Sequence, residues 1–350
     1  MTSPMPWLKK SMRGFTIASI FMTDRVVQIP RGHAPLRIKD GLNPTRVRVP
    51  EQRDGVSAYD FVWELIASQR HRHPEDTPDA LVHRFEADQV IIGPRFRIAS
   101  PTSVLHANDD VWFYRIPAPE PTIPYSCTVV YEDDTILVAD KPPFLATMPR
   151  GKHITNSATV QLRRSTGIDE LSPAHRLDRL TSGLLLFTKH KRVRGAYQTL
   201  FSERNVRKTY VATAEYNPVI TPGTVWRSHM TKTAGEIQGH IIDAPPPNAE
   251  TLVAAIERID APTQQRLHSL HGTDVDLARY TLKPHTGKTH QLRLHMLAAG
   301  VPILGDTIYP TILAENAEDY SRPMHLTSTE LEFTDPLTNR HCLFTGAVIR

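Results

Sequence analysis

A polar turn that leads directly into an unbroken apolar segment is the most constraining feature of this sequence. The turn, His175-Arg176-Leu177-Asp178-Arg179, holds one carboxylate between two guanidinium groups, and residues 183–187 then read Gly-Leu-Leu-Leu-Phe. A short apolar run bounded by polar turns predicts a strand buried on both faces. We therefore expect Asp178 at the rim of a packed sheet, where nearby cations favour its ionised form and it can act as a nucleophile. In isolation, an Arg-x-Asp turn is more often an exposed salt bridge. The rest of the chain must therefore decide between a salt bridge and a catalytic carboxylate.

Positive charge is concentrated around this turn. From residue 141 to residue 210 there are fourteen Lys and Arg against four Asp and Glu, although the whole chain has a net charge of only +4. A local excess of this kind indicates a polyanionic partner. A solvated basic face is the alternative.

Composition places the chain among ordinary globular proteins, with 350 residues, 40% apolar and 22% charged. Its two cysteines, Cys127 and Cys342, form no disulfide or zinc pattern, so we expect a reducing, cytoplasmic location and no metal. No apolar run reaches the roughly 18–20 residues that cross a bilayer. The basic and then apolar segment 9–22 lacks a cleavage site, which favours an extension or a misplaced start codon over a targeting peptide.

Four prolines between residues 116 and 124 indicate a stiff linker. We assign residues 1–53 to an irregular extension, 54–118 to a small α/β accessory domain, 119–125 to the linker and 126–350 to the main domain.

Periodicity predicts more strands than helices in the main domain, many of them joined by short turns. This pattern is typical of an α+β fold with a mostly antiparallel mixed sheet flanked by helices. The predicted elements are a helix over 56–66, strands over 89–93 and 104–113, a hairpin over 129–138, a basic helix over 190–204, strands over 208–214, 251–259 and 277–283, a capped helix over 286–300 and a closing hairpin from 324.

Four segments of the main domain carry a family resemblance. They are Lys141-Pro142, the HRLDRLTSG stretch over 175–183, Arg207-Lys208-Thr209-Tyr210, and TGKTHQLRLH over 286–295. In order and spacing they resemble the RluA family of RNA pseudouridine synthases, over residues 126–349. The resemblance implies the pseudouridine synthase fold and the isomerisation of specific uridines in rRNA (23S-type) or tRNA. It also implies a monomer that needs no cofactor or metal.

The resemblance further implies roles for three residues. Asp178 is the catalytic carboxylate, which attacks C1′ of the ribose, attacks C6 of the uracil, or removes a proton from C2′; all three routes stay open. Arg293 pairs with this carboxylate and fixes its orientation. Tyr210 stacks on the uracil and relays a proton.

RNA contacts are implied mainly by basic residues of the same motifs. Arg176 fills the space left by the flipped base, with a phosphate contact or a salt bridge as the alternative. His175 and Thr181 are expected to hold the turn, and Lys141 either meets the RNA backbone or packs beneath the site. The other candidate RNA-binding residues are Arg150, Lys152, Arg179, Lys208, Lys288 and His290.

Two positions depart from the family pattern. Phe144 stands where the family has Gly, and because Phe adopts positive φ at a cost, we expect this loop to follow another path. Lys288 stands where Arg is common, which keeps the charge but loses bidentate geometry. Residues 54–118 weakly resemble an S4-like RNA-binding domain without its basic helix, and a divergent accessory domain is the alternative.

Two other functions remain to be weighed against an isomerase. One is a catalytically idle RNA-binding or ribosome-assembly protein on the same fold, against which Asp178, Tyr210 and Arg293 argue. The other is hydrolysis of a glycosidic bond by paired carboxylates, which the lack of a second acid beside Asp178 disfavours.

Overall fold

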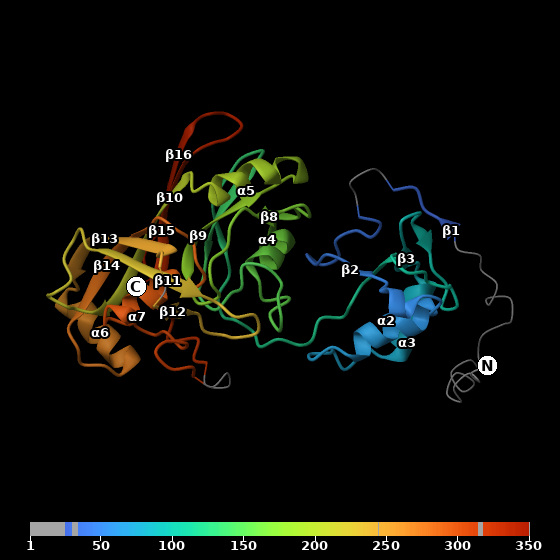
Figure 1. The fold of residues 1–350 in the computed structure, drawn as a ribbon, viewed down its shortest axis with the longest axis horizontal. Helices are drawn as coiled ribbons and strands as arrows, with labels where there is room; N and C mark the ends of the chain where they lie inside the picture. The colour runs from blue at the N-terminus through green and yellow to red at the C-terminus, as the bar shows by residue number, and fades with distance from the viewer. Residues whose placement is uncertain (1–24, 30–33, 244, 314–317, 350) are drawn as a thin grey trace. The chain divides into compact units, whose positions relative to one another are not determined.

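The computed structural model describes residues 25–29, 34–243, 245–313 and 318–349. The expectation for residues 9–22 lies outside these described residues. The chain divides into two compact units, and the division falls between Pro119 and Glu120 (Figure 1).

The smaller unit is a five-stranded antiparallel sheet, in the order β1-β4-β3-β5-β2, packed against two helices. Residues 45–48, which we assigned to an irregular extension, form β2 and pair with β5, so the predicted boundary at residue 53 is wrong for this segment. Helix α2 begins after Ser57, whose hydroxyl accepts a hydrogen bond from the Asp60 N–H as an N-cap. The elements of this unit are β1 (Arg25–Val26), β2 (Thr45–Arg48), the 3-10 helix η2 (Glu51–Arg53), α2 (Ala58–Ala67), α3 (Pro78–Glu86), β3 (Val90–Ile92), β4 (Arg97–Ile98) and β5 (Asp110–Phe113).

The larger unit is organised by one 11-stranded sheet, in the order β12-β11-β13-β14-β10-β15-β9-β7-β6, with β16 on β15 and β8 on β9. Its described strand pairs are antiparallel except β15 with β9. The predicted α+β class with a mostly antiparallel mixed sheet is confirmed. The elements are β6 (Thr128–Glu132), β7 (Ile136–Lys141), α4 (Ala158–Thr166), β8 (Ser172–Pro173), β9 (Ser182–Thr188), η3 (Lys191–Val193), α5 (Arg194–Ser202), β10 (Val206–Glu215), β11 (Val225–Thr231), β12 (His240–Ile242), β13 (Ala249–Arg258), α6 (Ala261–His271), β14 (Leu277–Pro284), α7 (Gln291–Ala298), β15 (Leu326–Thr334) and β16 (His341–Thr345).

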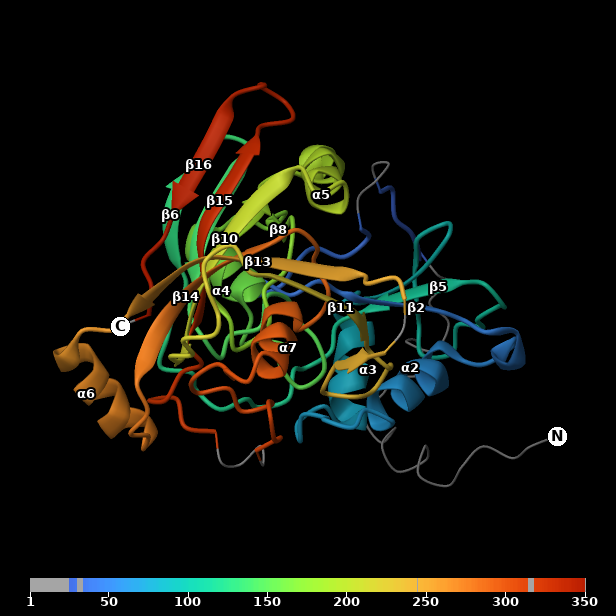
Figure 2. The same cartoon turned by 60° about the vertical axis from the view of Figure 1, so that its left-hand side comes forward.

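Strand β9 is buried along its whole length, as its apolar sequence predicts. Leu184 and Leu186 belong to the apolar cluster that contains Tyr197 of α5. Leu185 and Phe187 point to the opposite face and join the cluster that contains residues of α4 and α7. Helix residues therefore pack on both faces of β9, from the helices α4, α5 and α7 that Figure 2 labels beside the sheet. This is why the strand is continuously apolar rather than alternating.

Gly183 allows β9 and β15 to approach each other. Its φ is +103°, and a Cβ at this position would lie 2.2 Å from the carbonyl oxygen of Ser328. The two residues are register partners in the parallel pair. Glycine is therefore required here for steric as well as conformational reasons.

Phe144 adopts the positive φ that we expected a phenylalanine to avoid. It adopts φ +67°, the left-handed conformation that Gly would favour, at a cost of about 1–2 kcal/mol. Its ring is 1% exposed and contacts the rings of Tyr125 and Tyr320, with centroids 6.2 and 5.2 Å away. Burial of the aromatic ring offsets the backbone strain.

Helix α7 is shorter at its start than we expected. The sequence favoured a helix from Thr286, whereas the helix begins at Gln291 and is preceded by His290 at φ +58°. The predicted stop is confirmed, because the helix ends at Ala298 and Gly300 follows with φ +77°.

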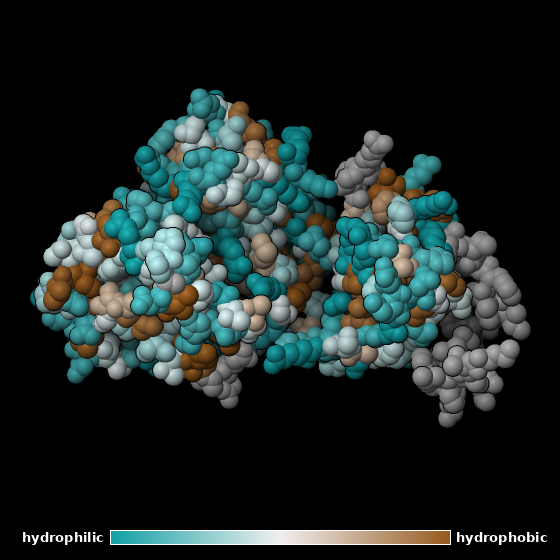
Figure 3. Space-filling view, viewed as in Figure 1, coloured by the Kyte–Doolittle hydropathy of each residue, from teal (hydrophilic) through white to brown (hydrophobic). Residues whose placement is uncertain are grey.

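The surface of the larger unit around β10 and α5 is mainly hydrophilic, with small separated apolar patches (Figure 3). Within the described residues, none of the helices has both the length and the apolar character needed to span a bilayer.

Replacement of Gly183 by alanine tests the close approach of β9 and β15. Because Cβ would collide with the Ser328 backbone and the φ is unfavourable, Gly183→Ala is expected to destabilise the protein by about 3 kcal/mol or more in urea unfolding. Gly195, inside α5 with no heavy atom within 4 Å of a built Cβ, is the matched control. Gly195→Ala is expected to stabilise by about 0.5–1 kcal/mol, and equal effects of the two changes would contradict the steric argument.

Two buried histidines predict acid sensitivity. His295 and His325 are 2% and 3% exposed, and burial lowers the pKa of each from 6.5 to about 4. The unfolded chain therefore takes up these protons first, and stability is lost as pH falls from about 6.5 toward 4, by up to about 1.4 kcal/mol per pH unit for each histidine. Urea unfolding at pH 7 and pH 5 measures this slope. It should become shallower in His295→Gln, and an unchanged slope would refute the assignment.

Candidate active site

The turn that carries Asp178 is held in place from both sides. The Thr147 hydroxyl donates to the Leu177 carbonyl (2.8 Å), and its oxygen accepts a hydrogen bond from the Leu177 N–H (3.1 Å). The Thr181 N–H donates to the Asp178 carbonyl (3.1 Å). His175 Nε2 accepts a hydrogen bond from the Leu186 N–H (3.1 Å), so the expected structural role of His175 is confirmed. The carboxylate therefore projects from a fixed backbone.

Asp178 lies in a cavity of about 280 Å³, at the small end of the range for small-molecule sites. Tyr210 of β10 and Arg293 of α7 line the same cavity, as do Arg176 and His290. Three segments are thus brought together, although Asp178 and Arg293 are 115 positions apart in the sequence. The sequence-predicted trio of Asp178, Tyr210 and Arg293 shares one site.

Tyr210 is turned toward the cavity by an irregularity in β10. The pairing of β10 with β15 shifts register between Thr209 and Tyr210, and such bulges re-aim side chains. The ring is 8% exposed. Burial and the nearby charge of Asp178 raise the pKa of Tyr210, so its phenol is a neutral hydrogen-bond donor at physiological pH.

Arg293 does not make the direct pair with Asp178 that we expected. Its Nε and Nη2 donate to the two carboxylate oxygens of Asp306, at 2.7 and 2.6 Å. Burial alone would lower the pKa of Arg293, but the hydrogen bonds and charge of Asp306 outweigh it and raise the pKa, with a further contribution from Asp178. Arg293 therefore acts on Asp178 through its electrostatic field, while Asp306 holds the guanidinium.

His290 is the basic side chain paired most directly with Asp178. Its Nε2 lies 4.0 Å from Asp178 Oδ2, and its Nδ1 shares a hydrogen bond of 2.9 Å with the Tyr309 hydroxyl. Burial lowers the pKa of His290, which favours the neutral ring. We predicted His290 only as an RNA contact, and its position beside the carboxylate is a role that the sequence analysis did not assign.

Asp306 and Tyr309 were also missed by the sequence analysis. The signal in the sequence was the pair Gly305-Asp306. The structure shows why a glycine stands there: its φ is +78°, and a Cβ would lie 2.3 Å from the Pro323 carbonyl oxygen. A glycine forced by such crowding marks a fixed backbone. The Asp306 carboxylate that follows also accepts hydrogen bonds from the N–H groups of Ile308 and Tyr309.

The structure contradicts an RNA contact by Lys141. The side chain is 0% exposed, and Nζ donates to the carbonyls of Pro142 (2.9 Å), Leu145 (2.8 Å) and Arg179 (3.2 Å). Burial lowers the pKa of Lys141 to about 7. Lys141 thus links the end of β7 to the turn that carries Asp178, through its hydrogen bond to the Arg179 carbonyl.

Arg179 is likewise engaged within the protein. Its guanidinium forms an ion pair with Glu318 and donates to the Phe144 carbonyl (3.3 Å). This internal pairing contradicts its expected contact with phosphate or solvent. The two arginines that flank Asp178 therefore differ in their surroundings: Arg179 is paired within the protein, whereas Arg176 is exposed at the cavity.

The remaining predicted RNA contacts lie on accessible surface. Lys208 and Lys288 line the cavity, half-buried and exposed respectively. Arg150 is exposed and Lys152 half-buried in a loop closed by backbone hydrogen bonds between Arg150 and His153. Within the described ranges, no group of three or more His, Cys, Asp or Glu is arranged to hold a metal ion.

Comparison with known proteins identifies the class to which this fold and site belong. Residues 135–298 match the family model described as RNA pseudouridylate synthase. The fold is similar to the solved structure of Human RNA Pseudouridylate Synthase Domain Containing 1, with a TM-score of 0.51 and 23% identity over 65% of this chain and 86% of that one. The fold is that of the pseudouridine synthases.

Curated relatives specify the family. The Dual-specificity RNA pseudouridine synthase RluA of Vibrio parahaemolyticus is 33% identical over 220 residues, 62% of this chain and 80% of the relative. The protein of the same name from Pasteurella multocida is 33% identical over 65% of this chain and 94% of its own length. The Ribosomal large subunit pseudouridine synthase C of Rickettsia bellii is 30% identical, over 66% and 71% respectively. The chain belongs to the RluA-type family of RNA pseudouridine synthases, which confirms the resemblance, and it is an enzyme that acts on RNA.

The assignment of Lys141 to the interior predicts a stability effect. Lys141→Met keeps an apolar stem of similar length but leaves three backbone carbonyls without their donor, so it is expected to destabilise the protein by about 2 kcal/mol or more in urea unfolding. Arg150→Ala removes an equal charge from an exposed loop and is expected to change stability by no more than about 0.5 kcal/mol. A Lys141→Met variant as stable as the wild type would restore a surface role for this lysine.

Proposed function

We propose that this enzyme isomerises particular uridines to pseudouridine in structured rRNA (23S-type) or tRNA, with Asp178 as the catalytic carboxylate. The single observation that carries the proposal is the convergence of Asp178, Tyr210 and Arg293 on one base-sized cavity. The names of the relatives support the substrate class, since they include a dual-specificity RNA enzyme and a large-subunit ribosomal one. The enzyme acts as a monomer in the cytoplasm, and its two free cysteines fit a reducing compartment.

The chemistry needs one ionised carboxylate next to the ribose and the base. The bond between N1 and C1′ breaks, a bond between C5 and C1′ forms, the hydrogen on C5 leaves to solvent and N1 carries a proton in the product. Asp178 begins this sequence by attacking C1′, by attacking C6, or by taking a proton from C2′. No second Asp or Glu lines the described cavity, which argues against hydrolysis by paired carboxylates.

Tyr210 and Arg293 assist the carboxylate in different ways. The Tyr210 ring offers a buried face on which uracil stacks, and its neutral phenol can relay a proton when C5 loses its hydrogen. Arg293 places a positive charge on the wall of the cavity that holds Asp178, and the two charges attract each other. Because its Nε and Nη2 donate to Asp306 rather than to Asp178, Arg293 leaves the Asp178 oxygens available to the substrate.

Entry of the uridine requires that it leave its base stack. Unstacking costs a few kcal/mol, and Arg176, exposed at the mouth of the cavity, is placed to occupy the vacated space. Among the described residues, no hydrogen bond or ion pair holds its guanidinium in place. A free guanidinium can stack on the neighbouring bases of the RNA.

Asp178→Asn tests the catalytic assignment. The amide has nearly the same shape but no negative charge, so product formation should fall below detection while RNA affinity changes by less than about three-fold. Release of tritium from RNA labelled at uridine C5 measures the first quantity, and filter binding of the same RNA measures the second. Turnover close to wild type in Asp178→Asn would refute the role, and no release by the wild-type enzyme from either rRNA or tRNA would refute the substrate class.

A further inference from the structure

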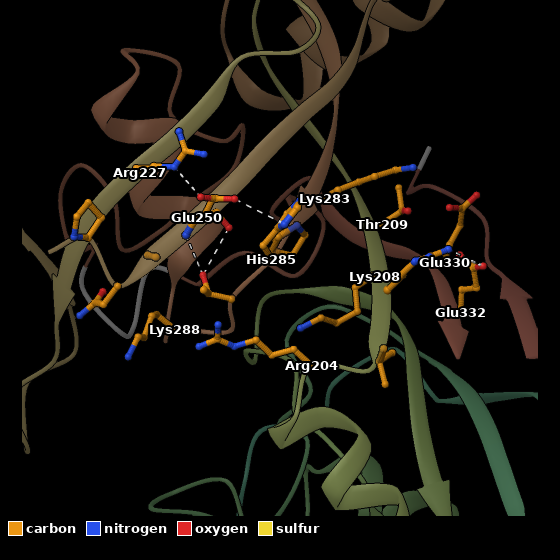
Figure 4. A pocket seen from close by; sticks show the side chains of 17 residues that line it. Arg204, Lys208, Thr209, Arg227, Glu250, Lys283, His285, Lys288, Glu330 and Glu332 are labelled. Carbon is orange, nitrogen blue, oxygen red and sulfur yellow. Dashed lines mark hydrogen bonds and ion pairs between the residues drawn. The ribbon is translucent and has the colours of Figure 1, made fainter. Parts of the chain in front are cut away.

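A second and larger cavity opens beside the Asp178 cavity. Its volume is about 910 Å³, and it runs across the five adjacent strands β15, β10, β14, β13 and β11 (Figure 4). Neighbouring strands are about 4.8 Å apart, so five of them span about 19 Å. We call this cavity the side groove; it is lined by residues 206–209, 247–250 and 283–286 with Arg204, Arg227, Lys288, Glu330 and Glu332.

The side groove is continuous with the Asp178 cavity. Lys208, Pro284, Thr286 and Lys288 line both of them. A smaller cavity of about 220 Å³ shares these same four residues and also reaches Arg204. A chain seated in the side groove therefore leads into the site where the uridine reacts.

Positive charge in the side groove is unevenly neutralised. Arg207 pairs with Glu332, and Arg227 pairs with Glu250. The described residues provide no ion pair for Arg204, Lys208, Lys283 or Lys288. Figure 4 shows Arg204, Lys208 and Lys288 with their charged ends on the same side of the cavity. Three of these four cations, Arg204, Lys208 and Lys288, thus line the end that adjoins the Asp178 cavity, whereas Lys283 and the carboxylate of Glu330 line the side groove alone.

Lys208 carries a desolvation cost and Arg204 a backbone strain, and a bound anion would offset both. Lys208 is half-buried, and burial lowers its pKa because no carboxylate compensates its charge. Arg204 has φ +63° just past the end of α5, a position where Gly is favoured over any residue with a Cβ. A strained arginine that makes no ion pair within the described protein is typical of a residue that serves a ligand.

We propose that the side groove binds the RNA strand that continues from the target uridine, with its phosphates against Arg204, Lys208 and Lys288. This inference rests on the proposed function. A stacked strand advances about 3.4 Å per nucleotide, so about 19 Å accommodates roughly five nucleotides. The preferred substrate is therefore a uridine adjoined on one side by a few unpaired nucleotides, as in a loop or bulge, rather than one enclosed by base pairs on both sides.

Binding of oligouridylates of two lengths tests this groove without knowledge of the natural RNA. Fluorescein-labelled (rU)3 and (rU)10 are titrated with the full chain, and anisotropy is measured from 50 to 300 mM KCl. Arg204→Gly should weaken (rU)10 binding about three- to ten-fold and reduce the salt slope by about 0.7, the value for one lost phosphate contact on a single strand. It should leave (rU)3 binding unchanged.

The stability of Arg204→Gly separates binding from a structural role. Glycine relieves the positive φ, so the unfolding midpoint should stay the same or rise while RNA affinity falls. Arg340→Ala, at an exposed arginine before β16 that lines none of these cavities, is the control for loss of charge and should leave both quantities unchanged. The proposal would be overturned if Arg204→Gly and the wild type bound (rU)10 equally. It would also be overturned if polyglutamate competed with the labelled RNA and binding did not depend on the length of the RNA.

Turnover distinguishes failure of this inference from failure of the proposed function. In the tritium-release assay with labelled rRNA and tRNA, Arg204→Gly should raise KM and retain kcat, since it contacts RNA away from the reacting atoms. Wild-type activity with an unchanged KM in the variant would overturn the side groove alone. Absence of wild-type activity on both RNAs would overturn the proposed function, whereas the oligouridylate binding would still report on the groove.

Discussion

The parallel pairing of β9 with β15 is the constraint on which the larger unit depends. It brings the Gly183 backbone against Ser328 without room for a Cβ, and it holds a strand with two buried faces inside the sheet, between β15 and β7. The Asp178 turn immediately precedes this strand and is bonded to it through His175. The carboxylate is rigid because the strand that follows it cannot shift without opening the core on both faces.

Charge around the Asp178 cavity is arranged in linked pairs rather than as one direct contact. Burial of an ion pair such as Arg293 with Asp306 is tolerated only with good geometry, and here two short hydrogen bonds provide it. Tyr309 connects this pair to His290, since its N–H donates to Asp306 and its hydroxyl shares a hydrogen bond with His290. The result is a wall of linked side chains beside Asp178 that leaves the carboxylate oxygens accessible to a ligand.

The basic residues between 141 and 210 have several different roles, and a count of charges does not distinguish them. Lys141 is a buried structural donor, Arg179 is paired with Glu318, and Lys189 is paired with Glu132. Arg204 and Lys208 remain for a ligand, together with Lys288 from a distant segment. The surplus of positive charge therefore correctly indicated a polyanion, but the cations that we propose to meet RNA are only part of that surplus.

The sequence by itself determined the fold class, the buried strand β9, the fixed turn that carries Asp178 and, through four motifs, the enzyme family. The apolar run and the order of residues in the turn and in each motif can be read directly from the sequence, although two anchors of the turn, Thr147 and Lys141, lie at least 30 residues away from it. The partner of Arg293, the burial of Lys141, the start of α7 at Gln291 and the positive φ of Phe144 were decided only by the tertiary structure. Each depends on groups far away in the chain: a guanidinium binds the carboxylate that packing brings within reach, and an aromatic ring that fills a core cavity can stabilise a strained backbone.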